Sequence, residues 1–261
     1  MLIIGAVLIA LAIGSWWLQR VAFSPTDDSG VAHSILGDED IRGQVASIVA
    51  AADAPILQQS PTQLKEFIEQ IARIPDGAAL MSRFVADAHS RLIGENDALV
   101  LITADEQVTI VRDEGVGEAS SLTLPVQEVG SMAFLDRWLG WVAIGTAVLG
   151  LVFLLGGVIL RPERGEGTFA LGIGLASLAG SMFVFGYLVP LAVLPSFSDD
   201  PWMGVFPRLA NHERNLTLLF VVLALVVAAL IVFGTSSRRD RRQGSTPLNV
   251  TRYRDDRSWS R

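Results

Sequence analysis

The sequence predicts an α-helical membrane protein with four transmembrane helices and a small, mainly helical α+β extracytoplasmic domain between helices 1 and 2. The first observation is composition: 51% of the 261 residues are hydrophobic, 18% are charged and the mean hydropathy is +0.45. Soluble proteins of this length are less apolar. The second observation is that four long stretches contain no ionisable side chain, and the third is a strong separation of charge along the chain.

The four spans follow from length, because a helix rises 1.5 Å per residue and needs about 20 apolar residues to cross roughly 30 Å of hydrocarbon. The stretches without Asp, Glu, Lys, Arg or His are Leu2–Leu18, Trp138–Leu160, Phe169–Leu194 and Leu216–Gly234. We assign transmembrane helices to residues 1–19, 138–160, 169–194 and 216–234. A cleaved secretory signal is the alternative for the first, although no basic segment precedes it and no A-x-A-like site follows it.

The segments between the spans are an acidic extracytoplasmic domain, a cytoplasmic loop, an extracytoplasmic loop and a basic cytoplasmic tail, at residues 20–137, 161–168, 195–215 and 235–261. The loop holds Arg161 and Arg164 and the tail holds eight arginines, which face the cytoplasm by the positive-inside rule. Both termini of this multi-pass plasma-membrane protein are then cytoplasmic.

Tryptophan supports the same orientation, because amphipathic rings prefer the headgroup layer. The residues that fall at the ends assigned to the outer surface are Trp16, Trp17, Trp138, Trp141 and Trp202. One signal favours the opposite orientation: no Lys or Arg precedes the first span, and Arg20 follows it.

The charge of the extracytoplasmic segment limits its partners. Residues 21–137 contain 19 Asp and Glu against 7 Lys and Arg, which excludes a nucleic-acid-binding module. The chain contains no cysteine, so disulfides, thiolate metal sites and cysteine nucleophiles are excluded. We expect membrane lipids as partners, together with another envelope protein bound through the acidic domain.

Capping signals divide the domain into helices after a linker or loop at residues 24–37, which is rich in Ser, Asp and Gly. Asp38 is a predicted N-cap, and the apolar stripe that follows it ends before Pro55. Ser60 begins a capping box with proline in the first turn. A third helix is predicted from about Ala78 to Leu92, with Gly94 as its left-handed cap.

The end of the domain predicts a small β element. Leu99–Ile102 and Leu122–Val126 are short β-like runs that we expect to pair. Thr103 begins a capping box for a helix between them. Pro125 requires an edge position because it lacks a backbone N–H.

Residues that could carry chemistry are few. His33, His89 and His212 fall on the outer side, where a metal site or an acid–base group is conceivable. None has a partner at ligand spacing, and the three acids at 38–40 are better explained by the helix dipole. No catalytic, nucleotide-binding or metal motif is present, so we assign no catalytic residue, no cofactor and no metal ligand.

Two features concern packing and the membrane surface. Gly172, Ala176 and Gly180 recur every four residues in the third span, so its backbone can approach another helix, either within the bundle or across a dimer. Pro190 and Pro195 are predicted to kink and then stop that helix. Trp202, Phe206 and Leu209 have helical spacing, which predicts a short helix lying in the outer interface.

Four segments in this order resemble uncharacterised integral membrane proteins of actinobacteria, including mycobacteria and corynebacteria. They are HSILGDEDIRGQVASIV, VADAHSRLIG, LTLPVQEV and GYLVPLAVLPSFSDDPWMGVFP. The similarity covers most of residues 30–235. It implies an inner-membrane location and the same anchor, outer domain and three-helix arrangement, and it implies no substrate or reaction.

The sequence therefore favours a non-enzymatic envelope scaffold or accessory protein that binds a partner through its outer domain. A handler or transporter of an envelope lipid or small molecule is the first alternative, although the spans lack the ionisable residues of coupled transporters. An extracytoplasmic hydrolase that uses His89 or His33 is the second alternative.

Overall fold

The computed structural model describes residues 1–23, 29–160 and 166–243. Four of its helical stretches are long and apolar enough to cross a membrane: Leu2–Phe23, Gly130–Ile159, Gly167–Phe197 and Arg214–Gly234. They belong to α1 (Leu2–Phe23), α8 (Gly130–Ile159), α9 (Glu166–Phe183) with its continuation, and α11 (Arg214–Gln243). The predicted class is confirmed, because a mainly helical region with a two-stranded sheet separates the first span from the second.

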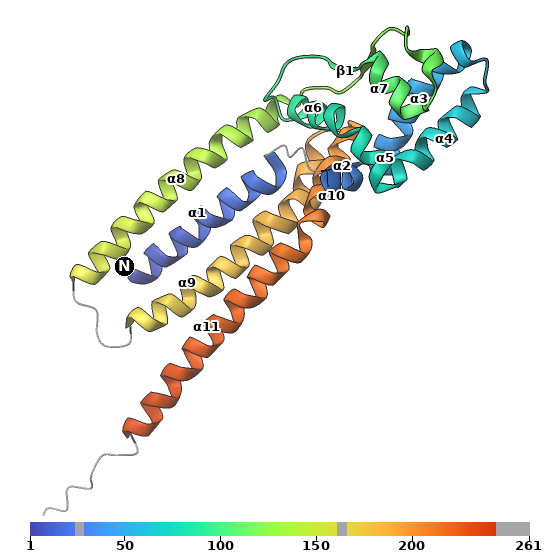
Figure 1. Ribbon diagram of the computed structural model, residues 1–261. Helices are drawn as coiled ribbons and strands as arrows, with labels where there is room; N and C mark the ends of the chain where they lie inside the picture. The colour runs from blue at the N-terminus through green and yellow to red at the C-terminus, as the bar shows by residue number, and fades with distance from the viewer. Residues whose placement is uncertain (24–28, 161–165, 244–261) are drawn as a thin grey trace, which may run out of the picture.

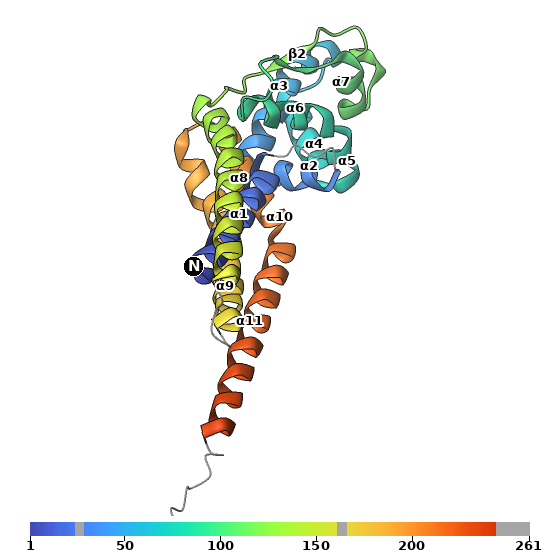
Figure 2. The same cartoon turned by 90° about the vertical axis from the view of Figure 1, so that its left-hand side faces the viewer.

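The four long helices lie side by side in the order α8, α1, α9, α11 (Figure 1), and α8, α1 and α9 overlap when the layer is turned by 90° (Figure 2). α1 packs against both α8 and α9, and α11 packs against α9. The start of α1 and the ends of α8 and α11 lie away from the domain. Of the most apolar 18-residue stretch of α1, 39% is buried inside the protein, against 11% of the corresponding stretch of α8. The shortest predicted span is therefore the central helix.

Small residues allow α1 to approach its neighbours closely. A Cβ atom added to Gly5 of α1 would lie 2.9 Å from the carbonyl oxygen of Gly150 in α8, and one added to Gly150 would lie 3.0 Å from that of Gly5. On the other side, a Cβ atom on Gly174 of α9 would lie 2.8 Å from the Cβ of Ala6. Such backbone proximity is how membrane helices gain packing energy, since lipid tails are as apolar as leucine.

Two side-chain hydrogen bonds join α1 to α11 and to α9 inside the layer. The Trp17 Nε1–H donates to Thr217 Oγ1 of α11 at 3.2 Å, and the Ser181 Oγ–H of α9 donates to the carbonyl oxygen of Ala10 at 2.8 Å. Trp17 is therefore buried in the bundle, and its indole is occupied by a protein partner instead of a headgroup.

α9 continues beyond Phe183 as a π-helical stretch, η2 (Val184–Val193), and then as η3 (Leu194–Phe197). Pro190 lies within η2 and cannot donate a main-chain hydrogen bond, and the wider π turn accommodates it. Gly186 of the same stretch lies directly against the Trp17 ring. Helical structure persists to Phe197, two residues past Pro195.

The domain consists of short helices with a two-stranded sheet. Its elements are α2 (Ser29–Leu36), α3 (Glu39–Leu57), α4 (Pro61–Arg73), α5 (Pro75–Leu80), α6 (Ser82–Leu92), β1 (Val100–Ile102), α7 (Ala104–Val111), η1 (Glu114–Val116) and β2 (Leu122–Leu124). β1 and β2 are antiparallel, with Leu101 opposite Thr123. The predicted pairing of these two runs is confirmed.

Local signals were correct where a side chain closes a helix end. The Asp38 carboxylate accepts hydrogen bonds from the amides of Asp40 and Ile41, and Thr103 forms both halves of a capping box with Glu106. Gly94 has a φ of +72°, as a left-handed cap requires.

Four local predictions need correction. Residues 29–36 of the predicted linker form α2, while residues 24–28 lie outside the described part. α3 continues through Pro55 to Leu57, because a proline near a helix end removes only one hydrogen bond. Ser60 precedes α4 but makes no side-chain capping bond. The predicted helix over 78–92 is divided at Met81 into α5 and α6.

Candidate functional site

The connection between α9 and α11 is built into the domain core. It contains η4 (Pro201–Gly204) and α10 (Val205–His212). Trp202 and Phe206 are both fully buried, at 0% exposure, and the Trp202 Nε1–H donates to Gln44 Oε1 at 2.9 Å. The structure thus places both rings, which the sequence assigned to the outer interface, in contact with protein instead of lipid headgroups.

An ion pair fixes the same connection to the start of α3. The Arg208 Nε lies 3.3 Å from Asp38 Oδ2, and the Ser34 Oγ–H donates to the carbonyl oxygen of Arg208 at 3.0 Å. Asp38 therefore both caps α3 and forms an ion pair with α10, and this pair connects the domain to the segment between the last two spans.

His89 joins the domain to the end of α1. Its Nε2 lies 2.9 Å from the Ala22 carbonyl oxygen, and because a carbonyl only accepts, the ring proton is on Nε2. Burial lowers the pKa of His89 to about 4, which keeps the ring neutral. The ring also packs edge-on against Phe206, with centroids 6.2 Å apart. This histidine is a buried structural contact and is not exposed to a substrate.

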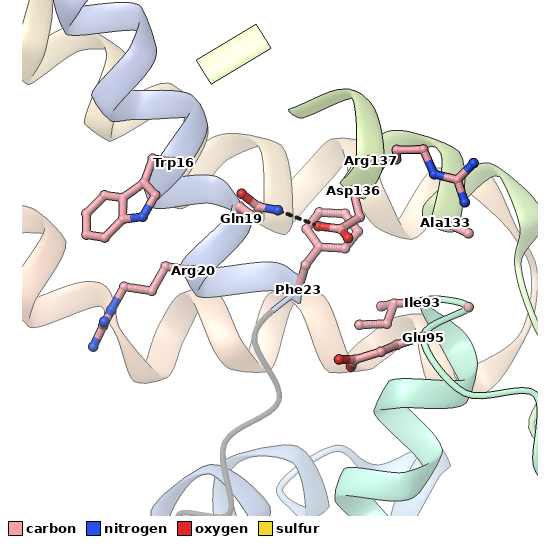
Figure 3. A pocket seen from close by; sticks show the side chains of 10 residues that line it. Trp16, Gln19, Arg20, Phe23, Ile93, Glu95, Ala133, Asp136 and Arg137 are labelled. Atoms are coloured by element: carbon pink, nitrogen blue, oxygen red, sulfur yellow. Dashed lines mark hydrogen bonds between the residues drawn. The ribbon is translucent and has the colours of Figure 1, made fainter. Parts of the chain in front are cut away.

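A polar cavity opens where α1, α8 and the end of α6 meet; we call it the junction pocket. Its volume is about 670 Å³, within the usual range of small-molecule sites. Figure 3 shows the side chains that line it, which come from three parts of the chain; those of Gln19 and Asp136 point toward each other, and those of Arg20 and Arg137 extend in opposite directions. They are Trp16, Gln19, Arg20 and Phe23 of α1, Ile93, Gly94 and Glu95 after α6, and Ala133, Asp136 and Arg137 of α8.

Four charged side chains line the junction pocket without pairing with one another. The Asp136 carboxylate accepts a hydrogen bond from the Gln19 amide at 3.0 Å, and that of Glu95 accepts one from Ser90 at 3.3 Å. In the view of Figure 3, Arg20 and Arg137 lie on opposite sides of these carboxylates. Within the described part of the chain, neither guanidinium has an ion-pair or hydrogen-bond partner. Among the described residues, the pocket therefore contains two guanidinium groups without a protein partner and two carboxylates whose hydrogen-bond donors are uncharged.

Exposed tryptophans surround this level of the molecule. Trp16 forms one wall of the junction pocket and is 52% exposed, and Trp138 and Trp141 of α8 are 53% and 68% exposed. Indole rings at the end of apolar helices are typical of the membrane–water interface. Trp16 thus lies in the wall of the pocket, and Trp138 and Trp141 follow the pocket residues of α8 in the sequence.

The predicted packing residues of the third span have different surroundings. Gly172 is buried, and a Cβ atom there would lie 3.1 Å from Val232 of α11. Ala176 and Gly180 are exposed, and no atom lies within 4 Å of a Cβ position on Gly180. Gly174, which the pattern did not single out, makes the close approach to α1.

The remaining histidines form no recognisable centre. His33 is half-buried, and His212 is exposed at the end of α10. Across residues 1–23, 29–160 and 166–243, no group of three or more His, Cys, Asp or Glu side chains is arranged to hold a metal ion.

Asp53 is a buried acid that sequence reasoning missed. Its side chain is 0% exposed, and neither carboxylate oxygen has a hydrogen-bond partner among the described residues. Burial raises the pKa of Asp53 from 3.8 to about 6. The sequence pattern does indicate its burial, because Asp53 continues the four-residue spacing of Val45 and Val49 on the buried face of α3.

The junction pocket also had a signal in the sequence. Gln19 and Arg20 follow the first span, while Asp136 and Arg137 precede the second. Both pairs lie at the ends of consecutive spans that adjoin the domain, so helix packing brings them together. The contribution of Glu95 depends on where α6 ends and has no such signal.

Comparison with known proteins identifies no relative: no family model matches the chain, and no curated protein or solved structure is significantly similar to it. The resemblance to actinobacterial membrane proteins therefore stays a prediction.

We predict that Asp53→Asn stabilises the protein at neutral pH. The folded-state pKa is raised, so the stability from the protonated acid is complete below about pH 3.8 and lost as the pH rises to about 6. The amide cannot ionise, and at pH 8 the variant should gain up to about 3 kcal/mol. Thermal unfolding of detergent-solubilised protein between pH 4 and pH 8 measures this difference.

The exposed Asp97→Asn is the matched control and should unfold like the wild type throughout. A melting temperature of Asp53→Asn that is unchanged at pH 8, or equally shifted at pH 4, would contradict the assignment of a buried, unpaired carboxylate.

Proposed function

We propose that this membrane protein is a non-enzymatic lipid-binding protein that holds the head of a zwitterionic phospholipid in the junction pocket. The observation that carries the proposal is the set of four charges, two of each sign, that line one interfacial cavity without pairing with one another. Of the hypotheses that the sequence left open, this site supports the handling of an envelope lipid best.

The chemistry of the lining matches a head that carries both charges. A guanidinium binds phosphate through paired N–H donors, and either Arg20 or Arg137 is available for this contact. The carboxylates of Asp136 and Glu95 can accept hydrogen bonds from an ammonium group. Because the lining charges sum to zero, a zwitterionic head fits better than an anionic one.

We further propose that the domain and the junction pocket face outward, with both termini in the cytoplasm. The positive-inside rule supports this orientation through the arginines of residues 161–168 and 235–261. The helix ends that adjoin these segments lie at the end of the bundle opposite the domain (Figure 1).

The other two expectations have less support. Binding of an envelope partner through the acidic domain stays a prediction. A hydrolase that uses His89 gains nothing from the structure, because that ring is buried and bonded to a main-chain carbonyl.

Cysteine labelling tests the orientation directly, since the chain has no cysteine of its own. In intact cells, a membrane-impermeant maleimide should label Glu118→Cys in the domain and leave Ser245→Cys in the tail unlabelled. Permeabilised cells provide the control, in which both sites should react. Labelling of position 245 but not 118 in intact cells would reverse the proposed topology.

Native mass spectrometry of the detergent-solubilised protein tests the lipid site. We expect a one-to-one complex with phosphatidylethanolamine that is tighter than that with phosphatidylglycerol of the same chains. Loss of the charge-assisted bonds in Arg20→Gln/Arg137→Gln should weaken the phosphatidylethanolamine complex about tenfold.

Arg73→Gln is the matched control, because this exposed arginine lies at the end of α4, outside the pocket. Equal affinities for the double variant and the control would remove the support for the junction pocket as a headgroup site.

A further inference from the structure

One face of α1 runs from the apolar part of the membrane into the junction pocket. Leu2, Ala6, Ile9, Ile13, Trp16 and Arg20 follow one another at alternating steps of four and three residues. In a helix of 3.6 residues per turn, these positions share a single stripe. Ile13 is the last aliphatic residue of the stripe, and Trp16 is the first that lines the junction pocket.

The apolar part of this stripe is the floor of a second cavity, which we call the α1 groove. The groove has a volume of about 270 Å³ and lies between α8 and α9, which pack on either side of α1. Its lining includes Leu2, Ala6, Ile9 and Ile13 from the floor, Leu154 from α8 and Leu175 from α9. No charged side chain lines it, so it matches hydrocarbon.

The α1 groove is about as long as the hydrocarbon of one leaflet is deep. At 1.5 Å per residue, α1 rises about 16 Å from Leu2 to Ile13. The hydrocarbon of one leaflet is about 15 Å deep, half of a core of about 30 Å. A chain that enters beside Ile13 can therefore extend along the groove toward Leu2.

We propose that the α1 groove binds one acyl chain of the phospholipid whose head occupies the junction pocket, so that a single lipid lies along α1. This inference rests on the proposed function and adds the second half of the ligand. The occupant is a bilayer lipid, because a charged pocket and an apolar groove on one helix face match its polar head and its chain. The groove adds van der Waals contacts along the chain to the contacts of the head, because lipid tails are as apolar as the lining and gain nothing by transfer.

The groove can be blocked without touching the pocket. Ile13→Trp places a large ring in the groove from its floor, and Leu171→Trp does so from α9. Leu11→Trp is the matched control, because Leu11 has nearly the same exposure as Ile13, 38% against 36%, and lines neither cavity. Melting temperatures of the three variants establish that each remains folded.

Native mass spectrometry with phosphatidylethanolamine gives the decisive measurement. Ile13→Trp and Leu171→Trp should each weaken lipid binding about tenfold, while Leu11→Trp binds like the wild type. Glycerophosphoethanolamine, which has the head but no chain, should bind all four proteins equally weakly.

The alternative results separate the two proposals. If folded Ile13→Trp and Leu171→Trp bind the lipid as tightly as Leu11→Trp, the chain does not occupy the groove, and the headgroup site still stands. If the wild type retains no phosphatidylethanolamine, the proposed function fails and the groove proposal falls with it.

Discussion

The close packing of α1 between α8 and α9 is the interaction on which the rest of the structure depends. Gly5 and Gly150 bring two backbones together on one side, and Ala6 and Gly174 do so on the other. Without a hydrophobic driving force between helices in lipid, such contacts must supply much of the association energy. They also create the two cavities, because α1 forms the floor of the groove and a wall of the junction pocket.

The domain is held to this layer by contacts from distant parts of the chain. His89 bonds to the end of α1, Arg208 pairs with Asp38, and the Trp202 indole bonds to Gln44. These bonds lie in or beside a buried core, where competition from water is reduced. Gly94 lies directly against Ala133 of α8, next to Glu95, so the geometry of the pocket depends on domain and membrane helices together.

The sequence predicted the spans, the caps at Asp38 and Thr103, and the paired strands, because each depends on residues close together in the chain. The environment of Trp202 and Phe206 could not be predicted, since helical spacing of apolar residues is the same whether a face meets lipid or protein. The burial of the acid at position 53 could be predicted from its place in the apolar spacing of α3. The charges that α1 and α8 contribute to the pocket could be predicted from the ends of consecutive spans, whereas that of Glu95 depends on where α6 ends.

The central claim is that α1 is the core helix of the bundle, and a pair of glycine substitutions in α8 tests it most directly. Gly150→Leu inserts a side chain where α1 leaves no room, whereas Gly145 has no atom within 4 Å of its Cβ position. Overpacking should lower the melting temperature of Gly150→Leu in detergent by roughly 5 °C, and Gly145→Leu should melt like the wild type. Equal melting temperatures for both variants would contradict a central α1.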